Sequence, residues 1–532
     1  MKAATWRRVR QTVQAVALLL FLYLLLGTRQ GGATFLPHDL FFRLDPLAGL
    51  TAMLAGRRWI ASLALGGVTL LLTLLLGRVW CGWLCPLGTL LDWTSLRRPR
   101  ADEPDLRVGW RGVKHFLLFT ILFAALLGNL TLLVLDPITL LFRTITAAAL
   151  PPLNSLITAA ETALYRFGPL QAPLEAFDRL VRGRLLVVEQ PFFQQNLLLA
   201  LVFAGVLALN AIRPRFWCRY LCPLGALLGL FSKVAWLRHV VDEAACTGCA
   251  RCVRVCPTGT IEPGRNFAAD PAECTLCLDC LENCPTNAIS FRGQWGWAEW
   301  RRYDPSRRQV LASLGAAVAG VGLLRSAPAA RREHPHLIRP PGARENDLLS
   351  KCIRCGECLK ICPTAGLQPS LLTSGWEGLW TPLLVPRLGY CDYSCHSCGQ
   401  VCPTGAIPRL TLEEKRQTVI GVAYIDENRC IPWADGCDCI VCEEMCPVPE
   451  KAIRLEEQTV VNCRGETVTV QRPRVLRDLC IGCGICEYQC PLNGEAAIRV
   501  YVPNAFNARA ISRSLPLIHA EHGTGIRFEA NT

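Results

Sequence analysis

The sequence lacks the signatures of several common classes of cofactor and ligand. It has no Cys-x-x-Cys-His motif, which excludes a covalently attached c-type haem. The glycines between residues 315 and 322 do not spell Gly-x-Gly-x-x-Gly, so a nicotinamide or flavin site has no support. No nucleic-acid-binding motif is present, although the net charge is +13. We therefore expect no nucleic-acid partner, and we attribute many of the basic residues to loops that orient membrane helices.

Long hydrophobic stretches, by contrast, are abundant. Hydrophobic residues make up 51% of the 532-residue chain and are crowded into its first 240 positions. A helix needs about 20 apolar residues to cross a bilayer, and four stretches qualify: 9–27, 59–80, 113–135 and 191–212. Arginine and lysine are concentrated in the N-terminus, in the second loop and after the fourth stretch, and the positive-inside rule places these segments in the cytoplasm. We expect a multi-pass protein of the inner (cytoplasmic) membrane, in contact with the lipid bilayer.

Residues 1–239 contain an internal repeat. The pattern Trp-Cys-x-x-Leu-Cys-Pro-Leu-Gly occurs at 80–88 and again at 217–225, and an Asp-Pro pair occurs at 45–46 and at 136–137. The same order of helix, Asp-Pro, helix and CxxxCP predicts four transmembrane helices arranged as a parallel repeat. The cysteines of the two CxxxCP motifs have three possible roles: to bind a shared cofactor, to act as redox thiols or to pack structurally. They are Cys81, Cys85, Cys218 and Cys222.

A short apolar segment separates two cysteine-rich regions. Arg307 and Arg308 precede the apolar stretch 312–324, and Ala-Pro-Ala follows at 327–329. This resembles a twin-arginine export signal in the middle of the chain; the alternative is a short fifth membrane helix. Both interpretations place the residues beyond about 330 in the periplasm. We assign 303–345 to this segment and its linker, and 506–532 to a tail without a recognisable pattern.

The cysteines form tight groups of four. A disulfide scaffold is short and loop-rich, whereas this chain is long and its 30 cysteines are grouped, which favours metal or cluster ligation. Residues 240–295 contain two regular runs of Cys-x2-Cys-x2-Cys-x3-Cys-Pro, the bacterial ferredoxin spacing in which the fourth cysteine ligates the other cluster. The two predicted [4Fe–4S] ligand sets are Cys246, Cys249, Cys252 and Cys284, and Cys274, Cys277, Cys280 and Cys256.

Residues 346–505 contain four more groups, and we expect six [4Fe–4S] clusters in total. The outer two groups are regular and the inner two irregular. By symmetry we favour exchange of the fourth cysteine between the two outer groups and between the two inner groups. Cys437 is a weaker alternative to Cys439, and Cys463 is left as an ordinary free cysteine. The four groups are Cys352, Cys355, Cys358 and Cys362; Cys391, Cys395, Cys398 and Cys402; Cys430, Cys439, Cys442 and Cys446; and Cys480, Cys483, Cys486 and Cys490.

Oxidation of a quinol requires a proton acceptor near the outer membrane face. His38, Asp39, Asp45 and Asp136 are the candidates there. Helix capping and turn formation are equally good explanations for the aspartates. The sequence therefore assigns no catalytic residue.

These motifs resemble two known ferredoxin families. Residues 1–295 are similar to the NapH-type membrane ferredoxin, the quinol dehydrogenase membrane component of nitrate reductase systems, with related membrane blocks in the NosR and CcoG families. Residues 303–505 resemble the exported NapG/MauM-type ferredoxin with four clusters. The resemblance implies a membrane α-helical bundle with two α+β ferredoxin-like domains. It also implies electron transfer from the quinol pool to a periplasmic reductase or cytochrome in anaerobic respiration. A maturation or metal-reducing factor, as in the CcoG family, is the alternative.

Overall fold

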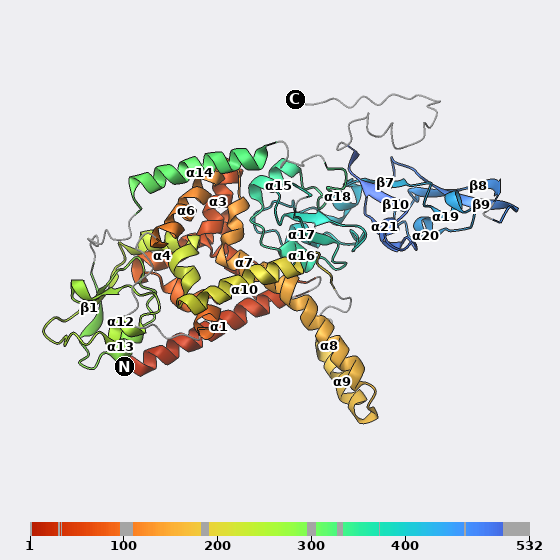
Figure 1. Cartoon of the computed structure of the whole chain (residues 1–532). Coiled ribbons are helices and arrows are strands. Elements are labelled where there is room, and N and C mark those ends of the chain that lie inside the picture. Colours follow the sequence, from red (N-terminus) through yellow and green to blue (C-terminus); the bar gives the residue numbers. More distant parts are fainter. Residues whose placement is uncertain are drawn as a thin grey trace.

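A central block of helices separates two cysteine-rich domains. The structure is a computed structural model that describes residues 3–29, 32, 34–95, 110–181, 191–294, 305–326, 334–371, 373–461 and 464–503. The first domain, with helix α12 (Arg251–Val255), and the second, with helix α16 (Glu357–Ile361), lie at opposite ends of the block (Figure 1). The predicted tail, Cys463 and the Ala-Pro-Ala pattern at 327–329 lie outside the described residues.

The two halves of the block have the same order of elements. Each half has a long helix, a short helix after Asp-Pro, an apolar helix, a π-helical turn with the first cysteine of CxxxCP, and a helix that begins at its proline. The first half comprises α1 (Ala3–Gly27), α2 (Leu40–Arg43), α3 (Pro46–Gly56), η1 (Ala61–Leu65), α4 (Gly66–Leu76), η2 (Trp80–Leu84) and α5 (Pro86–Trp93). The second half comprises α6 (Trp110–Leu126), η3 (Thr131–Leu135), α7 (Pro137–Thr144), η4 (Ile145–Ala149), α8 (Leu150–Leu164), α9 (Gly168–Val181), α10 (Asn196–Ile212), η5 (Trp217–Leu221) and α11 (Pro223–Ser232).

The Asp-Pro pairs start α3 and α7 by the same local mechanism. Proline stands at the first helical position, where its missing N–H is not needed. Asp45 accepts hydrogen bonds from the amides of Leu47 (2.8 Å) and Ala48 (3.3 Å). Asp136 accepts them at the same positions of α7, at 3.0 and 2.9 Å. Both aspartates are therefore helix N-caps.

Two helical stretches among the described residues are long and apolar enough to cross a membrane, Thr5–Gly27 and Pro137–Leu164. The first contains the predicted stretch 9–27. The second was not among the predicted stretches, and it contains two prolines, Pro151 and Pro152. A π-helical turn, η4, precedes them, and they occupy the first turn of α8, where proline is tolerated. The predicted stretches 59–80, 113–135 and 191–212 lie in shorter helices.

Helix α14 (Arg307–Arg325) runs along the block from the first domain toward the second (Figure 1). Ser306 caps it through a reciprocal capping box with Gln309. Its small residues allow close packing on α6, where Ala317 and Val321 contact Ala124. Near the end of α14, Arg325 donates a hydrogen bond to the carbonyl of Leu127 (2.9 Å).

The two cysteine-rich domains have short helices and two-stranded antiparallel sheets. The first contains β1 (Leu237–Val241) paired with β4 (Ile289–Gly293), α12, β2 (Ile261–Glu262) paired with β3 (Ala268–Ala269), η6 (Pro263–Arg265) and α13 (Asp279–Asn283). The second contains α15 (Glu345–Lys351), α16, β5 (Leu367–Pro369) paired with β6 (Pro382–Leu384), α17 (Ser397–Gln400), α18 (Leu412–Gln417), β7 (Val422–Ile425) paired with β10 (Ile498–Tyr501), α19 (Ile431–Ala434), α20 (Val441–Glu444), the hairpin of β8 (Ile453–Val461) and β9 (Thr467–Val475), and α21 (Ile485–Gln489).

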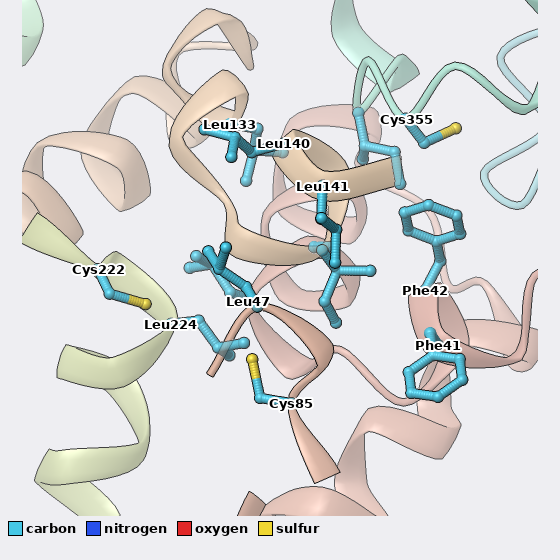
Figure 2. Packing of buried hydrophobic residues seen from close by; sticks show 14 of the residues in the cluster. Phe41, Phe42, Leu47, Cys85, Leu133, Leu140, Leu141, Cys222, Leu224 and Cys355 are labelled. Carbon is cyan, nitrogen blue, oxygen red and sulfur yellow. The ribbon is translucent and has the colours of Figure 1, made fainter. Parts of the chain in front are cut away.

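The core of the block continues into the second domain. One cluster of buried hydrophobic residues includes all four CxxxCP cysteines, and also Ile353 and Cys355 of the second domain. Figure 2 shows Cys85, Cys222 and Cys355 in this core, with Leu47 and Leu141 among them. The block and the second domain therefore share one packed interior.

Candidate iron–sulfur centres

The backbone has the same conformation around the first three cysteines of all four regular groups. In each CxxCxxC loop, the residue before and the residue after the second cysteine have positive φ. Residues other than glycine rarely adopt positive φ. Such strained backbone is found mainly where the surrounding structure holds it in place, as at binding sites. The residues are Gly248 (69°) and Ala250 (54°), Leu276 (48°) and Leu278 (64°), Arg354 (60°) and Gly356 (89°), and Gly482 (74°) and Gly484 (82°).

The fourth cysteine of four groups lies against the hydroxyl of a threonine two residues later. The Sγ–Oγ1 distance is 3.6 Å at Cys256 and Cys362, and 3.8 Å at Cys284 and Cys402. Amides also point at sulfur, as from Ala288 to Cys284 (3.3 Å). Hydrogen bonds to ligand sulfurs tune the reduction potential of a cluster.

In the first domain, Cys256 lies in the electrostatic neighbourhood of Cys274, Cys277 and Cys280. Cys256 is the fourth cysteine of the run that begins at Cys246. Its position near the cysteines of the second run is the one that the predicted exchange of fourth cysteines requires. Helices α12 and α13 pack on each other, which brings the end of each run to the start of the other.

In the second domain, two cavities identify the ligand sets directly. One is lined by Cys352, Cys355, Cys358 and Cys402. The other is lined by Cys362, Cys391, Cys395 and Cys398. The first two groups of this domain therefore exchange their fourth cysteines.

The last two groups show the same exchange. Cys490 lies near Cys430, and Cys446 lies near Cys480 and Cys483. The predicted pairing of outer with outer and inner with inner groups is therefore wrong. The physical reason is local packing: α16 lies on α17 and α20 lies on α21, so neighbours in sequence form one compact unit.

The choice between Cys437 and Cys439 follows from their positions. Cys437 is exposed and faces the carbonyl of Asp435 (3.8 Å). Cys439 lies within electrostatic range of Cys430 and Cys442. The structure thus assigns Cys439 to the third group of this domain.

Groups of four thiols around a cavity fit a [4Fe–4S] cluster, which supplies one-electron chemistry when bound. Burial raises the pKa of Cys391 to about 11 and that of Cys483 to about 12. Only the thiolate is a metal ligand. Cluster assembly at these cysteines therefore releases protons.

One buried carboxylate lies in the contact between the first domain and the block. Glu273, next to the ligand Cys274, pairs with Lys114 and with Arg78 (3.2 Å) and lies 3.8 Å from Arg111. All four side chains are at most 1% exposed. Burial acts to raise the pKa of Glu273, but the three cations outweigh it and lower the pKa to about 2. The carboxylate stays charged at the interface.

A cluster loop itself touches the block. The indole of Trp83 donates a hydrogen bond to the carbonyl of Leu276 (2.9 Å). Gly82 lies so close that an added Cβ would stand 2.0 Å from the carbonyl oxygen of Thr275. The π-helical turn η2 and the loop of Cys274 are therefore in backbone contact.

The second domain docks at the other end in a similar way. Arg143 of α7 donates a hydrogen bond to the carbonyl of Arg354 (3.1 Å), inside the Cys352–Cys355 loop. Arg354 donates to the hydroxyl of Thr131 (3.3 Å). Glu377 accepts from Asn129 (3.2 Å) and from Arg325 (3.1 Å). This interface could not be predicted from the sequence, since nothing in the pattern of isolated arginines indicates which carbonyls they bind.

The quinol candidates have structural partners. Asp39 pairs with Arg43 (2.7 Å), and His38 Nδ1 lies 3.2 Å from the hydroxyl of Thr34. Asp45 and Asp136 are caps, but their side chains also face each other. One oxygen of each, Oδ2 of Asp45 and Oδ1 of Asp136, has no hydrogen-bond donor among the described residues. The capping alternative accounts for one oxygen of each carboxyl group only.

Comparison with known proteins agrees with this geometry. A family described as a 4Fe-4S binding domain matches residues 58–102 and 195–241, and a 4Fe-4S dicluster domain matches 238–285 and 266–363. The methylamine utilization ferredoxin-type protein MauM of Methylorubrum extorquens is 37% identical over 207 residues, 37% of this chain and 89% of the relative. MauM of Paracoccus denitrificans is 37% identical over 208 residues, 37% of this chain and 88% of that protein. The ferredoxin-type protein NapG of Escherichia coli is 37% identical over 198 residues, 36% of this chain and 82% of NapG.

The chain belongs to the family of MauM and NapG ferredoxin-type proteins. It is an iron–sulfur electron-transfer protein with [4Fe–4S] ferredoxin domains. The alignments with these MauM and NapG relatives cover little more than a third of it. No solved structure matches the chain.

Proposed function

We propose that this chain is a membrane-spanning electron wire. It takes electrons from quinol, or from a cytoplasmic donor, and passes them through its [4Fe–4S] clusters to a periplasmic reductase or cytochrome. In this proposal the N-terminal 295 residues act as a NapH-type membrane component fused to the MauM/NapG-type domain.

The observation that carries this proposal is the placement of the two cysteine-rich domains. They dock on opposite ends of the helical block, and each docks through a CxxCxxC loop, at Leu276 and at Arg354. Helix α1 has 25 residues, which corresponds to about 38 Å at 1.5 Å per residue. A block of this height separates the domains by about the thickness of a bilayer.

A belt of exposed apolar side chains supports a lipid environment for the block. It is made of large apolar side chains that are exposed on four helices, and soluble proteins rarely expose so much apolar surface. Its members include Leu19 (64%) on α1, Leu71 (57%) on α4, Leu197 (68%) and Leu201 (61%) on α10, and Leu311 (67%) and Leu323 (72%) on α14. With these helices in the bilayer, the first domain faces the cytoplasm and the second the periplasm.

The charges at the helix starts support the same orientation. Arg10 of α1 pairs with Asp279 of the first domain (3.3 Å), and Lys114 of α6 pairs with Glu273. Arg307 and Arg308 begin α14. All three helices thus start with cations at the end of the first domain, as the positive-inside rule requires of a cytoplasmic face.

Reduction of the clusters by quinol in proteoliposomes tests the proposal. Purified full-length protein in vesicles with a reduced quinol should show bleaching of the visible cluster absorbance within seconds of quinol addition. Vesicles with the oxidised quinone serve as the control. If no quinol reduces the clusters while a soluble chemical reductant does, quinol is not the donor. A cytoplasmic donor, or a maturation or metal-reducing role, then becomes the better explanation.

A further inference from the structure

The four CxxxCP cysteines form one group in the structure, although they come from opposite halves of the repeat. Cys81, Cys85, Cys218 and Cys222 are each 5–8% exposed, and Cys222 lies within electrostatic range of the other three. Cys85 and Cys218 are likewise within range of Cys81. Each of the two π-helical turns, η2 and η5, holds the first cysteine of its motif, and the second cysteine stands at the N-cap position of the helix that follows. In Figure 2 the sulfurs of Cys85 and Cys222 both turn inward, toward Leu224.

Two arginines lock the motifs to each other. Arg78 and Arg215 occupy the same place, three residues before the first cysteine of each motif. Arg215 donates a hydrogen bond to the carbonyl of Cys81 in the other half (3.2 Å). Arg78 lies 3.9 Å from the sulfur of Cys81, and its guanidinium is 2.7 Å from the place where a Cβ of Gly225 would stand. Each arginine thus contacts the opposite motif.

The sulfurs have an amide donor and a guanidinium group beside them, as ligands of a metal centre often do. The amide of Gly225 donates a hydrogen bond to the sulfur of Cys222 (3.2 Å). The two guanidinium groups also have carboxylate partners, Glu273 for Arg78 (3.2 Å) and Asp92 for Arg215 (2.6 Å), so each cation lies between a carboxylate and the cysteines. Soft thiolate ligands select iron–sulfur clusters, zinc or copper(I).

The number of ligands decides how many centres the motifs form. The family described as a 4Fe-4S binding domain matches once in each half, at 58–102 and 195–241. Each matched segment contains only two cysteines, whereas a cubane cluster has four protein ligands. Neither half is sufficient alone.

We infer that Cys81, Cys85, Cys218 and Cys222 together hold a single, seventh iron–sulfur cluster at the junction of the two halves. The site stands on its own, but its use as a relay rests on the proposed function. Trp83, inside the first motif, touches the Cys274 loop, and the core that contains Cys85 and Cys222 extends to Cys355. A cluster held by these four cysteines would accept one electron from a reduced cluster of the first domain and pass one electron to the cluster of Cys355, or the reverse.

Iron and acid-labile sulfide in the anaerobically purified full chain provide the first test. Seven cubanes contain about 28 iron atoms per chain, and six contain about 24. The double variant Cys85→Ser, Cys222→Ser should lose about four irons and one Mössbauer component, while Cys437→Ser, at an exposed cysteine outside every group, should lose none.

The second test asks whether the halves act as one site. The pair Cys81→Ser, Cys85→Ser and the pair Cys218→Ser, Cys222→Ser should each remove the same iron as the variant with all four changes. A wild-type count of about 24, or additive losses from the two halves, overturns the single cluster. Zinc or copper that disappears with these cysteines overturns its identity as iron–sulfur. None of these readouts depends on quinol, so failure of the wire leaves them unchanged.

Discussion

Glu273 is the carboxylate on which the attachment of the first domain depends. Glu273→Gln removes the carboxylate that pairs with both Lys114 and Arg78 and leaves these buried cations uncompensated. Removal of one member of a buried pair costs about 3–5 kcal/mol. We expect a clearly lower midpoint in the thermal loss of cluster absorbance. Glu282→Gln is the matched control, because its pair with Arg7 is partly exposed and such pairs contribute about 0–1 kcal/mol.

The pH dependence of this contribution has a definite sign. The carboxyl group has a folded-state pKa of about 2, below the ordinary glutamate value of about 4.3. Its stabilisation is therefore complete above the ordinary value and is lost as the pH falls toward 2. The stability difference between wild type and Glu273→Gln should narrow over that range, and a constant difference would contradict the role of the charge.

The cysteine exchange gives a prediction for single ligands of the second domain. Cys402→Ser should disable the cluster of Cys352, Cys355 and Cys358, because Cys402 lines their cavity. Cys362→Ser should instead disable the cluster of Cys391, Cys395 and Cys398. EPR and Mössbauer spectra of the reduced variants distinguish the two, and damage to the Cys391 cluster in Cys402→Ser would mean that no exchange occurs.

The loops and short helices around the cysteines show how much of the cluster sites could be predicted from the sequence. Regular CxxCxxC spacing is sufficient to predict the loops, because this spacing lets three cysteine sulfurs of one loop face the same cluster. It was not sufficient for the pairing in the second domain, where the packing of α16 on α17 and of α20 on α21 decides. The helix that continues past Pro151 was also missed, because the π-helical turn before it leaves no sequence signature. The repeated Arg-x-Trp-Cys at 78–81 and 215–218 was a signal that could have indicated Arg78 and Arg215.

The contact between η2 and the Cys274 loop can be tested with one methyl group. Gly82→Ala places a Cβ 2.0 Å from the carbonyl oxygen of Thr275, so the turn and the loop must separate, at a cost of about 1–3 kcal/mol. We expect slower electron exchange between the first domain and the rest of the chain in stopped-flow reduction. Gly67→Ala is the control, since Gly67 in α4 has no neighbour within 4 Å of an added Cβ, and it should leave the rate unchanged.

The whole molecule connects two compartments only if its ends lie on opposite sides of the membrane. Helix α14 is the link between the first and second domains, and it runs along α6 for its length (Figure 1). Thiolates need reducing conditions for cluster insertion, so a periplasmic second domain would have to be loaded in the cytoplasm and then exported in folded form. The arginine pair before the apolar part of α14 has the position that such export requires.

A reporter at the C-terminus of the full chain tests this directly, and it leaves the Arg339–Glu345 pair at the start of the second domain intact (2.6 Å). We expect the reporter outside the cytoplasm in the unaltered protein and inside it after Arg307→Lys with Arg308→Lys. The same exchange at Arg7 and Arg8 preserves charge at the start of α1 and should not move the reporter. If the unaltered protein keeps its reporter in the cytoplasm, both cluster domains share one compartment. The chain would then be an electron hub attached to the membrane, because a wire across the bilayer needs its two docking ends on different sides.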